Sequence, residues 1–138
     1  MRPRVLVIDD DDALCETIRE VLGDEYAVAT ARHGAAALDL VKVHEPALIL
    51  LDLRMPIMDG WSFAQQYRQV VGVPARVVVM SAAGDLPHIA QQLGADGYLR
   101  KPFDLNKLQA LVAAELVARP SGGIEPDRTD RSSSAPLT

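Results

Sequence analysis

The chain has 138 residues, 49% of them hydrophobic, and a formal net charge of −5. This length suits one domain with a proper core, and the acidic balance gives no electrostatic footprint for nucleic acid or an anionic membrane. Cys15 is the single cysteine, which excludes an internal disulfide and fits a reducing compartment. No apolar run approaches the ~20 residues of a membrane span and no signal-peptide pattern is present, so we expect a cytoplasmic protein.

Apolar runs that alternate with helical patterns predict five strands and five helices. The strands are expected at 5–8, 26–30, 47–52, 75–80 and 97–100, and the helices at 14–22, 33–45, 60–71, 86–93 and 105–116. The runs at 5–8 and 47–51 are continuously apolar, and the run at 75–80 is apolar apart from Arg76, which is typical of strands buried on both faces of a parallel sheet. Strict alternation predicts a doubly wound α/β fold, and five strands favour the flavodoxin-like order 2-1-3-4-5.

Two of the predicted helices carry more specific expectations. The helix at 60–71 should pack through Phe63, Tyr67 and Val70, which recur at helical spacing. Asp104 precedes the last helix and can accept hydrogen bonds from its first turn as an N-cap.

Residues 120–138 differ in composition from the rest of the chain. Pro, Gly and Ser make up about half of this segment, and large apolar residues are almost absent from it. Such a segment cannot offset the entropy that it would lose on becoming ordered. We therefore expect one domain over 1–119, followed by a disordered tail over 120–138.

Acidic side chains follow two of the buried runs. Asp9 and Asp10 come directly after the first strand, and Asp52 ends the third. In the order 2-1-3-4-5 these strands are neighbours about 4.8 Å apart, so the carboxylates should meet where open α/β sheets bind their ligands. Like charges that close require a cation, and hard oxygen ligands suit Mg²⁺, with Mn²⁺ as an alternative. The acids therefore predict a divalent-metal site.

Two other strand ends add a hydroxyl and an ammonium group. Ser81 follows the fourth strand, and Lys101 follows the fifth. Phosphoryl transfer needs a nucleophile, a metal and donors for the phosphoryl oxygens. We therefore predict that Asp52 is the nucleophile and that Asp9 and Asp10 hold the metal. Ser81 and Lys101 would bind the phosphoryl oxygens.

The pattern resembles the receiver domain of two-component response regulators, in particular the single-domain, chemotaxis-regulator-like members. Four motifs carry the resemblance, each at an expected strand end. They are Val7-Ile8-Asp9-Asp10, Leu50-Leu51-Asp52-Leu53-Arg54-Met55-Pro56 with Met58-Asp59-Gly60, Met80-Ser81-Ala82, and Gly94-Ala95-Asp96-Gly97-Tyr98-Leu99-Arg100-Lys101-Pro102-Phe103. The resemblance covers roughly residues 4–117. It implies a phosphoprotein that works in signal transduction by phosphorelay.

The resemblance also implies roles for the acidic residues. Asp52 would accept a phosphoryl group from a histidine kinase or a histidine phosphotransfer protein. Asp10, Asp52 and the backbone carbonyl of Arg54 would ligate Mg²⁺. Asp9 would act largely through a metal-bound water.

The remaining implied roles concern a conformational switch. Ser81 would hydrogen-bond a phosphoryl oxygen, and Lys101 would pair with it. Tyr98 would turn inward when Ser81 moves and would couple Asp52 to the face formed by the fourth helix, the fifth strand and the fifth helix. That face would contact a downstream protein, with no nucleic acid or membrane as partner. The peptide bond between Lys101 and Pro102 would be cis.

Three alternatives remain open. A haloacid-dehalogenase-like phosphatase or phosphotransferase would have a second acid two residues after the nucleophile, where this chain has Arg54. We therefore expect self-catalysed phosphorylation and dephosphorylation at most, and no turnover of external substrates. A receiver that binds partners without using phosphate is a second alternative, and the intact acid set argues against it. The third is a receiver cut from a longer regulator, with the tail as the start of a linker.

Two positions beside the pocket bear on the lifetime of an aspartyl phosphate. Arg54 places a long cation two residues after Asp52, and Ala83, two residues after Ser81, is too small to exclude water. The sequence is compatible with an Arg54 that shields the phosphoryl group, one that recruits water and one that points into solvent.

Overall fold

The computed structural model of the protein describes residues 2–54, 59–70 and 75–117, so the tail expected over 120–138 lies outside the described residues. In these ranges the strands are β1 Arg4–Ile8, β2 Ala27–Ala31, β3 Leu48–Asp52, β4 Arg76–Ser81 and β5 Gly97–Arg100. The helices are α1 Asp12–Leu22, α2 Gly34–His44, α3 Gly60–Val70, α4 Leu86–Leu93 and α5 Leu105–Val117. None of these helices has the length and apolarity that crossing a bilayer requires.

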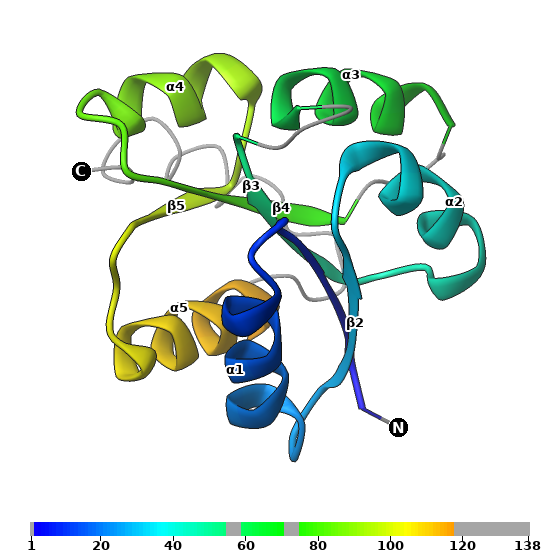
Figure 1. Cartoon of the computed structure of the whole chain (residues 1–138), viewed down its shortest axis with the longest axis vertical. Helices are drawn as coiled ribbons and strands as arrows, with labels where there is room; N and C mark the ends of the chain where they lie inside the picture. The colour runs from blue at the N-terminus through cyan, green and yellow to red at the C-terminus, as the bar shows by residue number, and fades with distance from the viewer. Residues whose placement is uncertain (1, 55–58, 71–74, 118–138) are drawn as a thin grey trace.

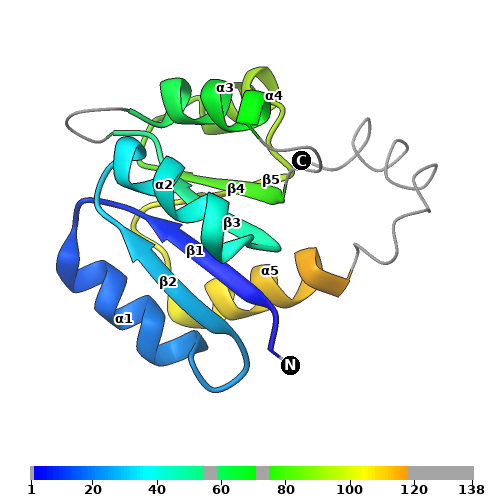
Figure 2. The same ribbon diagram turned by 90° about the vertical axis from the view of Figure 1, so that its right-hand side faces the viewer.

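The strands form one sheet between two layers of helices (Figure 1). Their order is β2-β1-β3-β4-β5, and each neighbouring pair is parallel. Helices α2, α3 and α4 cover one face, and α1 and α5 cover the other, with the sheet visible between the layers in Figure 2. The predicted flavodoxin-like α/β fold is confirmed.

Each face of the sheet has its own hydrophobic core, because alternate residues of a strand point to opposite faces. Ile49 and Leu51 of β3 pack in the core beneath α2, α3 and α4, together with Phe63. Leu50 packs in the core beneath α1 and α5, together with Ile18. All five residues of β3 are buried, as the continuous apolar run predicts for a central strand.

The packing stripe predicted for α3 is wrong at Val70. Phe63 and Tyr67 are buried, but Val70 is 50% exposed. The contact of α3 with the sheet ends at Tyr67, whose hydroxyl accepts a hydrogen bond from the backbone N–H of Ala75 at 2.7 Å. The last turn of the helix therefore lies beyond the core.

Side-chain caps fix where the helices around the carboxyl edge begin. Asp11 is the N-cap of α1, and its carboxylate accepts the N–H of Leu14 at 3.1 Å. Asp104 accepts the N–H of Lys107 at 2.7 Å ahead of α5, as predicted. A cap on the residue after Asp10 lets the chain turn directly from β1 into α1. Asp9 and Asp10 therefore stay at the sheet edge.

Candidate functional site

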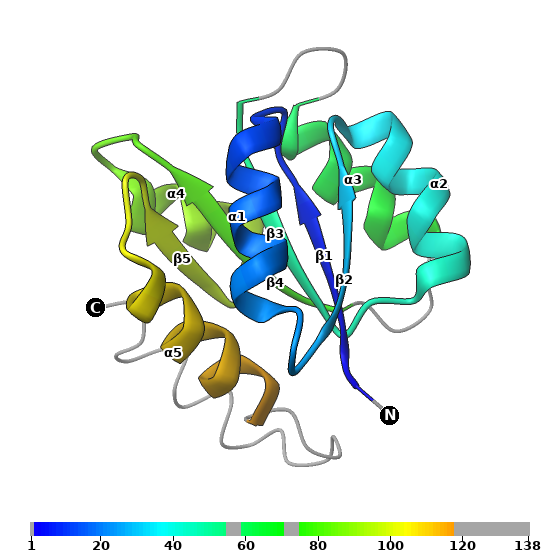
Figure 3. The ribbon, with the colours of Figure 1, turned by 60° about the horizontal axis from the view of Figure 1, so that its bottom comes forward.

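Three carboxylates meet at the carboxyl edge of the sheet, between β1 and β3. Figure 3 views the face that α1 and α5 cover and shows the strands running the same way toward this edge. Ligand atoms of Asp9, Asp10 and Asp52 all lie within 4.8 Å of one another. They converge because β1 and β3 pair in parallel register, with Ile8 opposite Leu51. Asp9 and Asp52 are buried and Asp10 is exposed, so the group is open to solvent on one side.

Lys101 enters this acidic group from the end of β5. Its Nζ donates to Asp9 Oδ2 at 2.8 Å and to Asp52 Oδ1 at 3.4 Å. The backbone N–H of Lys101 donates to the carbonyl of Ser81 at 2.9 Å, and the peptide bond from Lys101 to Pro102 is cis. One ammonium is thus shared between two buried carboxylates.

The carboxylate of Asp9 is the more firmly held of the two. Besides the shorter bond from Lys101, it accepts the backbone N–H of Asp11 at 3.0 Å on its other oxygen. Asp52 receives a backbone hydrogen bond from Arg54 and the longer bond from Lys101. Asp52 is therefore the carboxylate with the greater freedom to take a new partner.

The electrostatics of Asp52 follow from its surroundings. Burial raises the pKa of Asp52, and the neighbouring charge of Asp9 raises it further. The charge of Lys101 and the backbone hydrogen bond from Arg54 oppose this rise without cancelling it. Burial alone would lower the pKa of Lys101, but its bonds to Asp9 and Asp52 outweigh that and raise it. Because the ionised form of Asp52 is disfavoured in this site, a cation bound next to it would stabilise that form.

Ser81 borders the group from β4. In the sheet Met80 lies opposite Asp52, so Ser81 is one residue beyond the acid along the same edge. Ser81 is buried, and its Oγ accepts the N–H of Ala83 at 3.1 Å. Because that bond uses the oxygen as acceptor, the hydroxyl hydrogen can still be donated.

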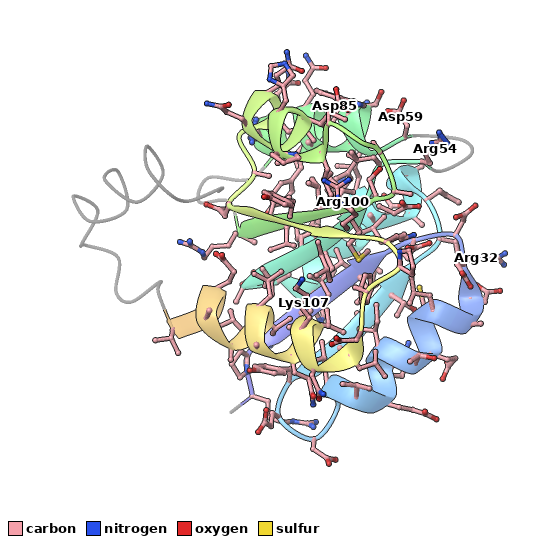
Figure 4. All side chains as sticks on the ribbon, turned by 90° about the vertical axis from the view of Figure 1, so that its left-hand side faces the viewer. Arg32, Arg54, Asp59, Asp85, Arg100 and Lys107 are labelled. Carbon is pink, nitrogen blue, oxygen red and sulfur yellow. The ribbon has the colours of Figure 1, made fainter. Side chains whose placement is uncertain are left out.

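Tyr98 and Arg54 differ in how they relate to the acidic group. Tyr98 is half-buried on β5, opposite Val79, and packs against the core beneath α3 and α4. The side chain of Arg54 is exposed and extends outward from the edge of the sheet (Figure 4). Arg54 thus contributes its backbone to Asp52, while its guanidinium faces solvent.

One contact beside the pocket was not predicted. Arg100, which pairs with Ser81 in the sheet, donates from Nη1 to the carbonyl of Ala83. The sequence did indicate the side of the sheet on which Arg100 lies, because residues two positions apart in a strand, such as Tyr98 and Arg100, point to the same face. What the sequence did not indicate is that the loop after Ser81 returns to within reach of that side chain.

Gly60 packs directly beneath the end of β3 and should not tolerate a side chain. A Cβ atom at Gly60 would lie 2.8 Å from the carbonyl oxygen of Asp52 and 2.9 Å from Cα of Leu53. Both are backbone atoms, so Gly60→Ala should lower the free energy of unfolding by about 1–3 kcal/mol. At Gly84 a Cβ would meet nothing within 4 Å, so Gly84→Ala is the matched control. Urea denaturation of both variants tests this, and equal midpoints would contradict it.

Comparison with known proteins agrees with this geometry. The family model of the response regulator receiver domain matches residues 5–113. The DNA-binding response regulator MtrA of Mycolicibacterium smegmatis is 40% identical in an alignment of 119 positions that covers 84% of this chain and 51% of MtrA. The response regulator MprA of Mycobacterium sp. strain KMS is 38% identical in an alignment of 130 positions that covers 92% of this chain and 56% of MprA. The chain spans about half the length of these curated relatives.

Solved structures give the same result. A two-component response regulator from Clostridium difficile superposes with a TM-score of 0.79 at 26% identity, over 87% of this chain and all of the other. The receiver domain of the Francisella response regulator 1452 gives a TM-score of 0.76 at 28% identity, over 85% and 98% of the two chains. Receiver domains are phosphoacceptors and not enzymes in the usual sense. With the family model matching most of its length and the acidic group at the expected edge, this chain belongs to the receiver domains of two-component response regulators.

Proposed function

We propose that Asp52 accepts a phosphoryl group from the phosphohistidine of a histidine kinase or a histidine phosphotransfer protein. Receiver domains are phosphorylated by histidine kinases. The observation that carries the assignment to Asp52 is its setting: a buried carboxylate with two further acids within 4.8 Å and the Lys101 ammonium at 3.4 Å. That combination supplies a nucleophile together with positive charge for the oxygens of a phosphoryl group.

The donor set fits Mg²⁺, with Mn²⁺ as an alternative. Asp10, Asp52 and the backbone carbonyl of Arg54 would hold the ion, and Asp9 would reach it through water. All of these donors are hard oxygens, and the exposed position of Asp10 leaves room for the waters that Mg²⁺ retains. When bound, the ion would neutralise charge that builds up on the phosphoryl oxygens.

The side chains of the chain itself would then carry the transfer. A carboxylate oxygen of Asp52 forms a bond to phosphorus while the bond from the histidine nitrogen breaks, and the imidazole leaves with that electron pair. Lys101 and Ser81 would donate hydrogen bonds to the phosphoryl oxygens. For this, the Lys101 ammonium would redirect one of its N–H groups from Asp9 to a phosphoryl oxygen. The present distances of Lys101 Nζ, 2.8 Å to Asp9 and 3.4 Å to Asp52, support this role because the ammonium already lies between them.

The proposed output is a change in the face formed by α4, β5 and α5. Ser81 and Tyr98 would act as its switch, and their side chains lie on the same face of the sheet because Ser81 pairs with Arg100, two residues beyond Tyr98. Tyr98 is half-buried, so its ring could move between a more buried and a more exposed position. This supports a two-state coupling between the acceptor site and the face formed by α4, β5 and α5. The downstream partner is proposed to be a protein, met in the cytoplasm, with residues 1–119 as the receiver and 120–138 as a disordered tail.

Phosphorylation by a small-molecule donor tests the acceptor role. Incubation with acetyl phosphate and Mg²⁺ should add one phosphoryl group to the intact protein, as measured by mass spectrometry. Hydroxylamine should remove it, since acyl phosphates react with amines, and EDTA should prevent its formation. Peptide mapping should assign the group to Asp52. A group mapped to another residue, or no gain in mass, would contradict the proposal, and steady phosphate release from a generic phosphomonoester would favour a phosphatase.

A further inference from the structure

The peptide unit of Ala83 connects the acceptor site to the outer face of β5. Its N–H donates to Ser81 Oγ at 3.1 Å, and its carbonyl accepts from Nη1 of Arg100. Arg100 is exposed, and Figure 4 shows it on the same side of the molecule as Asp85, which precedes α4. A solvent-accessible arginine therefore contacts the residue to which the Ser81 hydroxyl is hydrogen-bonded.

The loop that carries Ala83 has few other restraints of its own. Asp85 occupies the N-cap position of α4 but makes no side-chain capping bond. A Cβ at Gly84 would meet nothing within 4 Å. A helix start without a capping side chain has one stabilising contact fewer, so the hydrogen bond from Arg100 to Ala83 is one of the few side-chain restraints on this loop in the described residues.

The other end of α4 is held more firmly. Arg68 of α3 donates to the carbonyls of Leu93 and Gly94, at 2.5 and 3.4 Å. Gly94 adopts the left-handed conformation, with φ of 73°, and its N–H bonds back into the last turn of the helix. At its N-terminal end Leu86 packs in the core, but the loop before it is held through Ala83 by side-chain bonds to Ser81 and Arg100. Movement of this helix should therefore begin at the loop of residues 82–85.

Ser81 cannot reorient independently of this loop. Its oxygen is the acceptor for Ala83 N–H, so a Ser81 that turns toward a group on Asp52 either takes Ala83 with it or leaves that N–H unpaired. Arg100 opposes the first outcome by holding the Ala83 carbonyl. An interaction made only in the resting arrangement lowers the apparent affinity of the protein for a ligand that selects the other arrangement.

We infer that Arg100 is a positioning residue that holds the loop between β4 and α4 in its resting arrangement and thereby sets how readily Asp52 takes up a phosphoryl group and Ser81 turns toward it. The inference rests on the proposed phosphoacceptor function of Asp52. It adds that an exposed side chain on the output face acts against phosphorylation, so that contacts made to Arg100 by a protein would change the behaviour of the acceptor site. By linkage, phosphorylation would change the accessibility of Arg100 in return.

Titration with fluoroberyllate in the presence of Mg²⁺ tests the inference, because this anion mimics a phosphoryl group on a carboxylate. Fluorescence of Trp61 is a suitable signal, since Trp61 is 41% exposed and follows Gly60, which packs against the carbonyl of Asp52. Arg100→Ala should lower the apparent dissociation constant about 3- to 10-fold, the range expected for one lost hydrogen bond. Arg100→Lys should give an intermediate value. The affinity for Mg²⁺ alone should not change.

Two further measurements separate this role from a merely structural one. Lys107→Ala removes another exposed cation, from α5, and should leave the fluoroberyllate affinity within about twofold of the wild type if the effect is specific to Arg100. Amide hydrogen exchange of residues 82–85 should become faster in Arg100→Ala without any ligand. Unchanged exchange there, or an unchanged or weaker fluoroberyllate affinity, would overturn the inference. If the wild-type protein does not bind fluoroberyllate, or if the Asp52→Asn variant binds it equally well, the proposed function would be overturned instead.

Discussion

Replacing Asp52 by Asn should abolish the uptake of a phosphoryl group from acetyl phosphate and, at neutral pH in EDTA, should make the fold more stable. The loss of uptake follows because a carboxamide lacks the anionic oxygen that attacks phosphorus. The gain in stability follows because Asp52 is a buried anion close to Asp9, and Lys101 alone is shared between them. We expect an increase on the order of 1 kcal/mol in the free energy of unfolding, as is common when a functional site is relieved of strain.

The pH dependence of this gain has a definite sign. The pKa of Asp52 is raised in the folded protein, first by burial and then by the charge of Asp9. A carboxyl group with a raised folded pKa favours folding in its protonated form, so its contribution is fully present below the unfolded value of about 4. That contribution is lost as the pH rises through the folded pKa. The stability difference between Asp52→Asn and the wild type should therefore be small below pH about 4 and should grow above it.

Chemical denaturation at several pH values, with mass spectrometry for phosphoryl uptake, measures both effects. Asp59→Asn is the matched control, because Asp59 is an exposed acid that accepts the N–H of Ser62 at 2.9 Å, and Asn caps a helix as well as Asp does. It should keep normal uptake and stability. Mg²⁺ should raise the midpoint of the wild type more than that of Asp52→Asn. Uptake by Asp52→Asn would show that another residue is the acceptor, and a less stable variant would show that the carboxylates do not repel each other.

The fold was predictable because its signals are local in sequence. Each central strand contains an uninterrupted apolar run, and each helix after it has one apolar stripe, so that alternation alone specifies parallel pairing and two helical layers. The edge acids were predictable for the same reason. Once β1 and β3 are neighbours, Asp9 and Asp52 have to end at the same edge. The exposure of Val70 was not predictable, because the spacing of residues indicates which face of a helix is apolar but not where that helix ceases to contact the sheet.

The interactions that sequence reasoning missed join residues far apart in the chain. Arg100 reaches Ala83 only because the loop after β4 folds back toward β5. Arg76 falls within the strand predicted to be buried at 75–80, but no partner was predicted for its charge; it is 5% exposed and pairs with Glu115 of α5. A weak signal existed for Glu115, which follows Leu108 and Val112 at helical spacing and so lies on the buried face of α5. Nothing local indicated which cation it would meet.

The ion pair of Arg76 and Glu115 lies at the opposite end of the sheet from Asp52 and leads to the second large prediction. Nε and Nη2 of Arg76 each lie 2.8 Å from Oε1 of Glu115, and Asp96 lies 4.0 Å from Nη2. Gly97 leaves the space for this carboxylate, since a Cβ there would be 3.3 Å from Oε2 of Glu115. Nη1 of Arg76 is buried with no hydrogen-bond partner in the described part of the chain.

Glu115→Gln should therefore lower the free energy of unfolding by about 3 kcal/mol, because removing one partner of a buried pair leaves the other charge uncompensated. Asp96 remains near Arg76 and keeps the loss at the lower end of the usual range. Glu20→Gln, the same change at an exposed position of α1, should alter stability by less than about 0.5 kcal/mol. Urea denaturation followed by circular dichroism compares the two variants, and equal midpoints would contradict the prediction.

A double variant separates the value of the ion pair from the cost of breaking it. Replacing both charges with apolar residues, Arg76→Met with Glu115→Leu, removes the attraction and also the desolvation penalty that both ions carry when buried. Its stability should return to within about 1 kcal/mol of the wild type, above that of Glu115→Gln. If the double variant is as unstable as Glu115→Gln, the attraction between Arg76 and Glu115 makes a net contribution to the packing of α5 on β4. The instability of Glu115→Gln would then not come only from an unpaired buried charge.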